Sequence, residues 1–124
     1  VLFDLLIEMP AQPLDFVLSK HAVIQAMGLQ LLAQPNNRKT LAQWAHDFAL
    51  TERTLARLIK KQTGMTFGKW RMQLHIITAL QALSDGQSVQ QVSALLGYES
   101  VSAFITMFKK VMGKSPTKYM GDLN

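Results

Sequence analysis

The stretch FGKWRMQLHIITALQAL, residues 67–83, decides how the rest of the chain can fold. It contains no proline, and at about 100° per residue its apolar side chains fall on two nearly opposite sides of a helix. One stripe consists of Phe67, Trp70, Leu74 and Ile77, and the other of Met72, Ile76, Ala79, Leu80 and Leu83. A surface helix normally carries a single apolar stripe. Two stripes therefore predict a helix of roughly 25 Å that is held between two separate hydrophobic bodies.

The composition of the whole chain describes a folded, helix-rich protein without cysteine chemistry. Of its 124 residues, 48% are hydrophobic, and there are seven glycines, four prolines and no cysteine. The lack of cysteine excludes disulfides, thiol nucleophiles and cysteine-ligated zinc. The three histidines lack metal-ligand spacing, the eight acidic residues form no pair suited to acid–base chemistry, and there is no glycine-rich phosphate loop. We therefore expect no enzyme activity, no cofactor and no metal site.

The charge is distributed unevenly along the chain. Residues 1–37 carry a net charge of −2, whereas residues 38–124 hold twelve lysines and arginines against five acidic residues, a net charge of +7. A basic region of this kind suggests a polyanionic partner. An ordinary basic, solvated surface is the other interpretation.

The first twenty residues differ in character from the rest. Val1–Met9 is expected to form a short amphipathic helix that ends at Pro10. We interpret residues 1–20 as a tail, a linker or the remnant of a preceding domain. The opening segment is too short to span a bilayer and is not a signal peptide, so no membrane partner is expected. Because the chain begins with valine, we expect it to be a fragment of a longer protein.

Two segments on either side of residues 67–83 repeat the same order of elements. In residues 41–64, a short helix, a tight turn and a longer helix end in LIKKQTG, and residues 89–113 repeat this order and end in MFKKVMG. Each segment has the pattern of a helix-turn-helix. We predict an all-α fold of about seven helices, with two helix-turn-helix subdomains joined by a long central helix. The expected division is a first subdomain at 21–66, the joining helix at 67–83, a second subdomain at 84–120 and a tail at 121–124.

This predicted architecture suits double-stranded DNA. An α-helix fits the major groove with its N-terminal residues at the base edges, and two such helices on a rigid spacer can enter successive grooves about 34 Å apart. A spacer of roughly 25 Å is somewhat shorter than that, which would require the DNA to bend. Helix N-termini, their capping hydroxyls and the outer lysines can hold phosphates. The predicted phosphate contacts are Thr51, Lys60, Lys61, Ser100, Lys109 and Lys110.

The pattern of these residues resembles the DNA-binding domain of the AraC/XylS family of bacterial transcription regulators over about residues 21–120. The first half carries Leu41-Ala42, Ala45, Thr51, Arg53, Leu55 and Arg57. The second half carries the more specific Gly97-Tyr98, Ser100, Ser102, Phe104, Phe108-Lys109-Lys110, Gly113, Ser115-Pro116 and Tyr119. The resemblance implies a cytoplasmic regulator whose partners are promoter DNA and RNA polymerase. It also implies that a small-molecule effector acts only through a sensor domain ahead of residue 1.

The first expected reading helix offers strong donors to bases. Arg53 and Arg57 lie one turn apart, and each can bind O6 and N7 of a guanine, with Thr54 as a neighbouring contact. The alternative is that both arginines are merely solvated or are paired with Glu52 or Asp47.

The second reading helix departs from the family pattern, because Ile105-Thr106 stands where a small or polar residue and an arginine are usual. Its predicted base contacts are therefore methyl contacts or single hydrogen bonds. They are Val101, Ser102, Ile105 and Thr106. In the joining helix, His75 replaces a usual arginine or lysine, so a phosphate contact there is lost or depends on pH.

Two functions of other classes remain open at this point. One is a helix-turn-helix that serves as a protein-interaction module without DNA specificity, which the apolar second reading helix keeps open. The other is an RNA-binding module, although no exposed aromatic cluster suggests it.

Overall fold

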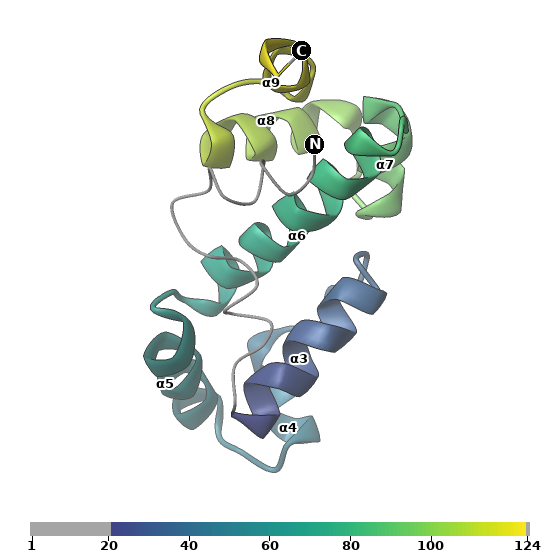
Figure 1. The fold of residues 1–124 in the computed structure, drawn as a ribbon. Coiled ribbons are helices and arrows are strands. Elements are labelled where there is room, and N and C mark those ends of the chain that lie inside the picture. Colours follow the sequence, from purple (N-terminus) through teal and green to yellow (C-terminus); the bar gives the residue numbers. More distant parts are fainter. Residues whose placement is uncertain (1–20, 124) are drawn as a thin grey trace.

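The computed structural model describes residues 21–123, and this part of the chain is entirely helical. The helices are α3 (Ala22–Ala33), α4 (Leu41–Asp47), α5 (Glu52–Thr63), α6 (Phe67–Ser84), α7 (Val89–Leu95), α8 (Val101–Met112) and α9 (Pro116–Asp122). Figure 1 shows two lobes on the ends of α6, with α3, α4 and α5 below and α7, α8 and α9 above. The predicted all-α architecture, with two helix-turn-helix units on a central helix, is confirmed. The helix predicted at Val1–Met9 lies outside the described residues.

Local sequence rules account for where the helices begin and end. Every described helix has a side chain at its N-cap that accepts a backbone hydrogen bond, as capping residues do. The helices α5 and α8 both end at a glycine in the left-handed region, Gly64 at φ 76° and Gly113 at φ 81°. The helix α6 ends at Ser84, one residue beyond the expected end at residue 83, since helix ends are defined by their last hydrogen bonds.

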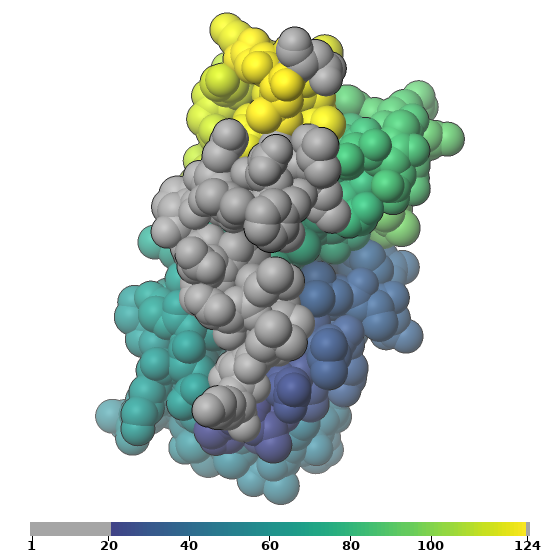
Figure 2. Space-filling view, in the orientation of Figure 1, coloured from purple at the N-terminus to yellow at the C-terminus, as the bar shows by residue number. Residues whose placement is uncertain are grey.

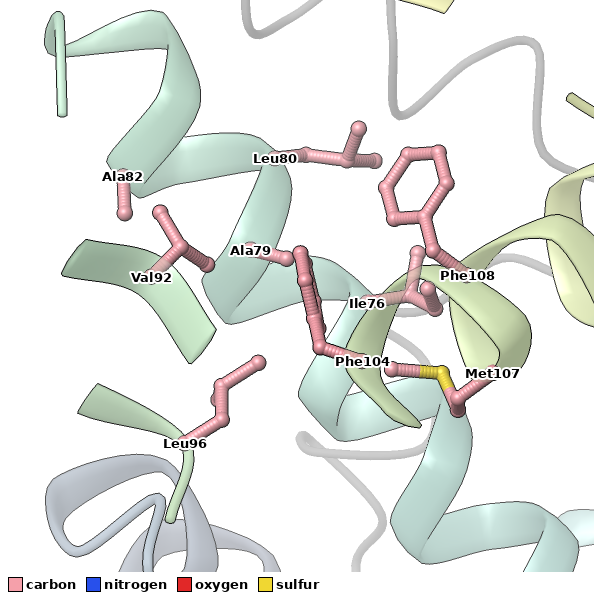
Figure 3. Close-up of a cluster of buried hydrophobic side chains, with 9 residues drawn as sticks. All are labelled: Ile76, Ala79, Leu80, Ala82, Val92, Leu96, Phe104, Met107 and Phe108. Atoms are coloured by element: carbon pink, nitrogen blue, oxygen red, sulfur yellow. The ribbon is translucent and has the colours of Figure 1, made fainter. Parts of the chain in front are cut away.

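The two apolar stripes of α6 serve two separate hydrophobic clusters, as predicted. Trp70 and Leu74 are buried in the first, together with side chains of α3, α4 and α5. Ile76, Ala79 and Leu80 are buried in the second against α7 and α8, where Phe104 and Phe108 fill the space (Figure 3). Because each lobe needs one face of α6 to complete its core, α6 cannot leave either lobe without exposing these side chains.

The two helix-turn-helix units repeat each other in detail. Both short helices begin with a complete capping box, Thr40 with Gln43 in α4 and Ser88 with Gln91 in α7. Both turns contain one residue with positive φ, Ala49 at 56° and Gly97 at 77°. The turn of the second unit is one residue longer, since residues 48–51 separate α4 from α5 and residues 96–100 separate α7 from α8. The repeat seen in the sequence is therefore a structural repeat as well.

The lobes also touch beside α6. In Figure 1 the loop after α3 rises towards the turn between α7 and α8, and in Figure 2 the blue surface of this loop meets the green surface of the second lobe. A Cβ atom added to Gly97 would lie only 3.0 Å from Cβ of Asn36 in that loop. Gly97 thus provides both the positive φ of the turn and the space for the neighbouring loop. Among the described helices, none is long and apolar enough to cross a membrane.

Candidate nucleic-acid interface

The outer face of α5 carries the polar side chains that were predicted to read bases. Leu55 and Ile59 are fully buried, which leaves Arg53, Thr54 and Arg57 exposed on the opposite side. Neither arginine forms an ion pair with any residue that the structure describes. Asp47, one of the acids considered as a partner, instead pairs with Lys39 at 2.6 Å. Both guanidinium groups are therefore available to an external ligand.

The N-terminus of α5 is organised by two threonine hydroxyls. Thr51 accepts from the backbone N–H of Thr54 at 3.1 Å, and its own hydroxyl donates to that of Thr54 at 2.8 Å. This exchange orients the Thr54 side chain towards the helix end, where the unpaired amides carry partial positive charge. Such an end can accept a phosphate oxygen.

The outer face of α8 is less polar than that of α5. Ser102 and Thr106 are exposed, whereas Val101 and Ile105 are half-buried, and Ile105 packs against the second hydrophobic cluster. The N-cap Ser100 accepts from the backbone N–H of Ala103 at 3.1 Å, as Thr51 does in α5. This helix offers hydroxyls and methyl groups but no arginine.

The lysines at the outer ends of the two longer helices are all exposed. Lys60 and Lys61 lie in the last turn of α5, and Lys109 and Lys110 lie in the last turn of α8. Lys60 donates to the backbone oxygen of Gly64 at 3.2 Å, which satisfies one of the free carbonyls at that helix end. The structure thus presents the four cations on the surface in two equivalent positions of the repeat.

A depression between the lobes brings the predicted Lys110 together with three cations that the sequence analysis did not single out. Its volume is about 460 Å³, and no carboxylate lines it. The cations around it are Arg38, Lys69, Arg71 and Lys110. Arg71 donates to the backbone oxygen of Lys39 at 2.9 Å, and burial followed by the nearby Arg38 lowers its pKa. Arg71 lies between the two apolar stripes of α6, whereas Lys69 lies in line with the second stripe, seven residues before Ile76. Basic residues at these two positions were the available signal.

His75, at the position where the sequence predicted that a phosphate contact is lost or depends on pH, lies inside the fold and not on its surface. Its side chain is 5% exposed, and its Nε2 and Nδ1 atoms lie 3.4 Å from Arg38 Nη1 and 3.2 Å from Tyr98 Oη. Burial, followed by the charges of Arg38 and Arg71, lowers its pKa from 6.5 to about 4, although the Pro35 carbonyl acts in the opposite direction. The imidazole is therefore neutral near pH 7, and its role is internal to the fold.

Two exposed, capped helices held on opposite ends of one spacer define a tandem helix-turn-helix protein. A sequence profile described as a helix-turn-helix domain matches residues 44–122. The chain belongs to this family, in its AraC/XylS-type form.

Two curated relatives agree with this assignment. The chain is 48% identical over 123 residues to the HTH-type transcriptional regulator NimR of Escherichia coli K12, covering 99% of this chain and 45% of NimR. It is 30% identical over 90 residues to RipA of Corynebacterium diphtheriae, covering 73% of this chain and 27% of that regulator. The chain thus spans less than half the length of both relatives.

The fold itself recurs in the C-terminal domain of AraT, a response regulator from Geobacillus stearothermophilus. The TM-score is 0.70 at 24% sequence identity, and the match covers 79% of this chain and 83% of that domain. At this identity the likeness concerns the fold alone.

Proposed function

We propose that this chain binds double-stranded promoter DNA in a sequence-specific manner, with α5 and α8 in successive major grooves on one face of the duplex. The observation that carries the proposal is the structural repeat. Two equivalent longer helices expose their capped N-termini and basic C-terminal turns, and both are held by the same helix α6. Helices presented in this way match the docking geometry of helix-turn-helix proteins.

In this proposal the first lobe supplies most of the base recognition. Arg53 and Arg57 are unpaired within the described chain and can each make a bidentate contact with guanine, and Thr54 contacts a neighbouring base. The second lobe reads through single hydrogen bonds and thymine methyl contacts. Its contacts are Val101, Ser102, Ile105 and Thr106. Since the two helices differ, the monomer binds an asymmetric site.

Affinity comes mainly from phosphates. The proposed backbone contacts are Thr51, Lys60, Lys61, Ser100, Lys109 and Lys110. The carboxylate-free depression between the lobes favours the same partner, since its two lysines, Lys69 and Lys110, attract the DNA segment between the two grooves. Binding should therefore weaken steeply as salt rises.

We further propose that the chain is the DNA-binding part of a bacterial transcription regulator. In such a protein it would act in the cytoplasm, where the chromosome lies, with RNA polymerase as a second partner. Any small-molecule effector would act through a domain outside this chain.

Selection of binding sites from a random duplex library tests the proposal. The 124-residue chain is incubated with the library near physiological salt, and enriched sequences are compared with those from the Arg57→Ala variant. For the native chain we expect two short conserved blocks about one helical turn apart. One block should contain a guanine that Arg57 reads, and the Arg57→Ala variant should no longer select that guanine. Salt-insensitive binding, or no enrichment with a protein partner captured instead, would favour the protein-interaction module.

A further inference from the structure

Arg38 connects the two lobes across the gap beside α6. It lies in the loop between α3 and α4, and its Nη2 donates to the backbone oxygen of Leu96, which is the C-cap of α7 in the other lobe. The guanidinium carbon also lies 5.4 Å from the centre of the Tyr98 ring, within range of a cation–π interaction. The carbonyls at a helix C-terminus have no partner inside the helix and favour a cation. Arg38 therefore caps a helix of the opposite lobe.

The same guanidinium is held in place on its own side. Its Nη1 donates to the backbone oxygens of Pro35 at 3.1 Å and Asn37 at 3.3 Å. Arginine has five donors in a planar fork, so one side chain can hold its own loop and reach the other lobe at once. Lysine lacks this planar fork and the fixed donor geometry that it provides.

Two further residues complete this contact between the lobes. His75 comes from α6, and Tyr98 comes from the turn between α7 and α8. The imidazole lies between Arg38 and the Tyr98 hydroxyl, and the His75 and Tyr98 rings meet edge to face with centres 5.8 Å apart. We call Arg38, His75, Tyr98 and the Leu96 carbonyl the clasp. It joins one group from the first lobe, one from the spacer and two from the second lobe.

The clasp constrains a motion that α6 alone leaves free. Helices α3–α5 make their main contacts with one another and α6, and α7–α9 do the same on the other side. A single helix between two lobes can bend or twist, and a small rotation at its middle moves α5 relative to α8. A second contact away from the axis of α6 restricts this motion. Because the two lobes are then already oriented before binding, less conformational entropy is lost when DNA is bound.

We propose that Arg38 is a positioning residue that sets the spacing between the two DNA half-sites which the chain accepts, through the clasp. The effect on spacing depends on the proposed binding of DNA by both lobes, whereas the effect on lobe orientation does not. The geometry of the clasp thus assigns a role in half-site spacing to a residue outside the proposed base and phosphate contacts. Loss of the clasp should leave each lobe folded, because both hydrophobic clusters exclude Arg38.

The first measurement needs no DNA. Because the chain has no cysteine, the double substitution Gln25→Cys and Gln90→Cys places one spin label on the exposed surface of each lobe. The distribution of distances between the labels is then compared in the otherwise native chain and with Arg38→Gln added. We expect a single narrow distribution in the first and a broad one in the second. An unchanged distribution in the presence of Arg38→Gln would overturn the proposal.

The second measurement uses duplexes carrying the two selected half-sites, separated by the selected spacing or by one or two base pairs more or less. For the native chain we expect affinity to fall by about tenfold or more at the altered spacings, and for Arg38→Gln by less than about threefold. Affinity for a single isolated half-site should not change. Equal spacing penalties in both proteins would overturn the proposal even if DNA binding itself is established.

Two further variants separate the clasp from general effects of charge and folding. Lys118→Gln removes one positive charge from α9, outside the clasp, and should leave both the label distances and the spacing penalty unchanged. Tyr98→Phe keeps the ring but removes the hydroxyl that meets His75, so it should broaden the distances less than Arg38→Gln does. If Arg38→Gln lowers the melting temperature too far for measurement, Arg38→Lys and Tyr98→Phe provide the same comparison. Native-like distances in both would overturn the proposal.

Discussion

Arg38 Nη1 lies 3.4 Å from His75 Nε2, although the two residues are 37 positions apart in the chain and belong to different elements. The other ring nitrogen, Nδ1, lies 3.2 Å from the Tyr98 hydroxyl, so each nitrogen of the imidazole faces a different lobe. A neutral imidazole thus joins the two lobes through the spacer helix. A cation at position 75 would instead face Arg38 and Arg71 without a counter-charge.

The first prediction concerns acid stability. The pKa of His75 is about 4 in the folded chain and near 6.5 when unfolded, so the unfolded chain binds the extra proton between these values. The contribution of His75 to the free energy of unfolding should be constant above pH 6.5. It should fall as the pH drops towards 4, by roughly 3 kcal/mol in total. The groups facing the imidazole are Arg38, Arg71, Tyr98 and the Pro35 carbonyl.

Denaturant unfolding of the native chain and of His75→Gln at several pH values between 7 and 4.5 measures this contribution. The variant should be less stable at pH 7, but its stability should depend less on pH in this range. Parallel pH profiles for the two proteins would contradict an internal, neutral His75.

The second prediction concerns base reading by Arg57. Its guanidinium is exposed on α5 and unpaired within the described residues, so truncation should leave folding intact. Arg57→Ala should cost about 1–3 kcal/mol on the selected site and relax preference at one base pair. Competition binding with single-base variants of the site measures both effects. An equal loss on random and selected DNA would assign Arg57 to the phosphates.

The third prediction concerns phosphate binding by Lys110, at the end of α8 and beside the depression between the lobes. Lys110→Ala should weaken binding to all sequences alike and reduce the slope of log affinity against log salt by about 0.9. Lys118→Ala, a matched loss of charge on α9, should change neither. A base-specific loss in Lys110→Ala would indicate that this lysine reaches into the groove.

The fourth prediction separates backbone strain from packing at the turn between α7 and α8. Gly64 and Gly97 have nearly the same φ, 76° and 77°, but only Gly97 has a close neighbour, Asn36. Gly64→Ala should therefore cost about 1 kcal/mol from strain alone. Gly97→Ala should cost about 1–3 kcal/mol more, since the new methyl group must displace the loop that holds Arg38.

Thermal and denaturant unfolding of both alanine variants tests this difference. Adding Asn36→Gly to Gly97→Ala removes the Cβ atom that the new methyl group meets and should recover part of the additional loss. Equal destabilisation of Gly64→Ala and Gly97→Ala would show that the loop and the turn do not pack closely.

The sequence by itself determined the elements of this protein and their order. Caps such as Thr51 and Ser100, the terminating glycines and the two stripes of residues 67–83 act over three to four positions, so their consequences can be predicted locally. The tandem repeat likewise indicated which helices would be exposed for reading.

Only the tertiary structure decided how the lobes are held and which cations lie between them. Arg38 meets Leu96 and His75 meets Tyr98 across sequence separations of 58 and 23 residues. Nothing in the local pattern around position 75 distinguishes a buried imidazole from an exposed one, because position 75 lies between the two stripes of α6. Its burial depends on a loop and a turn brought together by packing of both lobes on the same helix, and periodicity within one segment carries no information about such distant contacts.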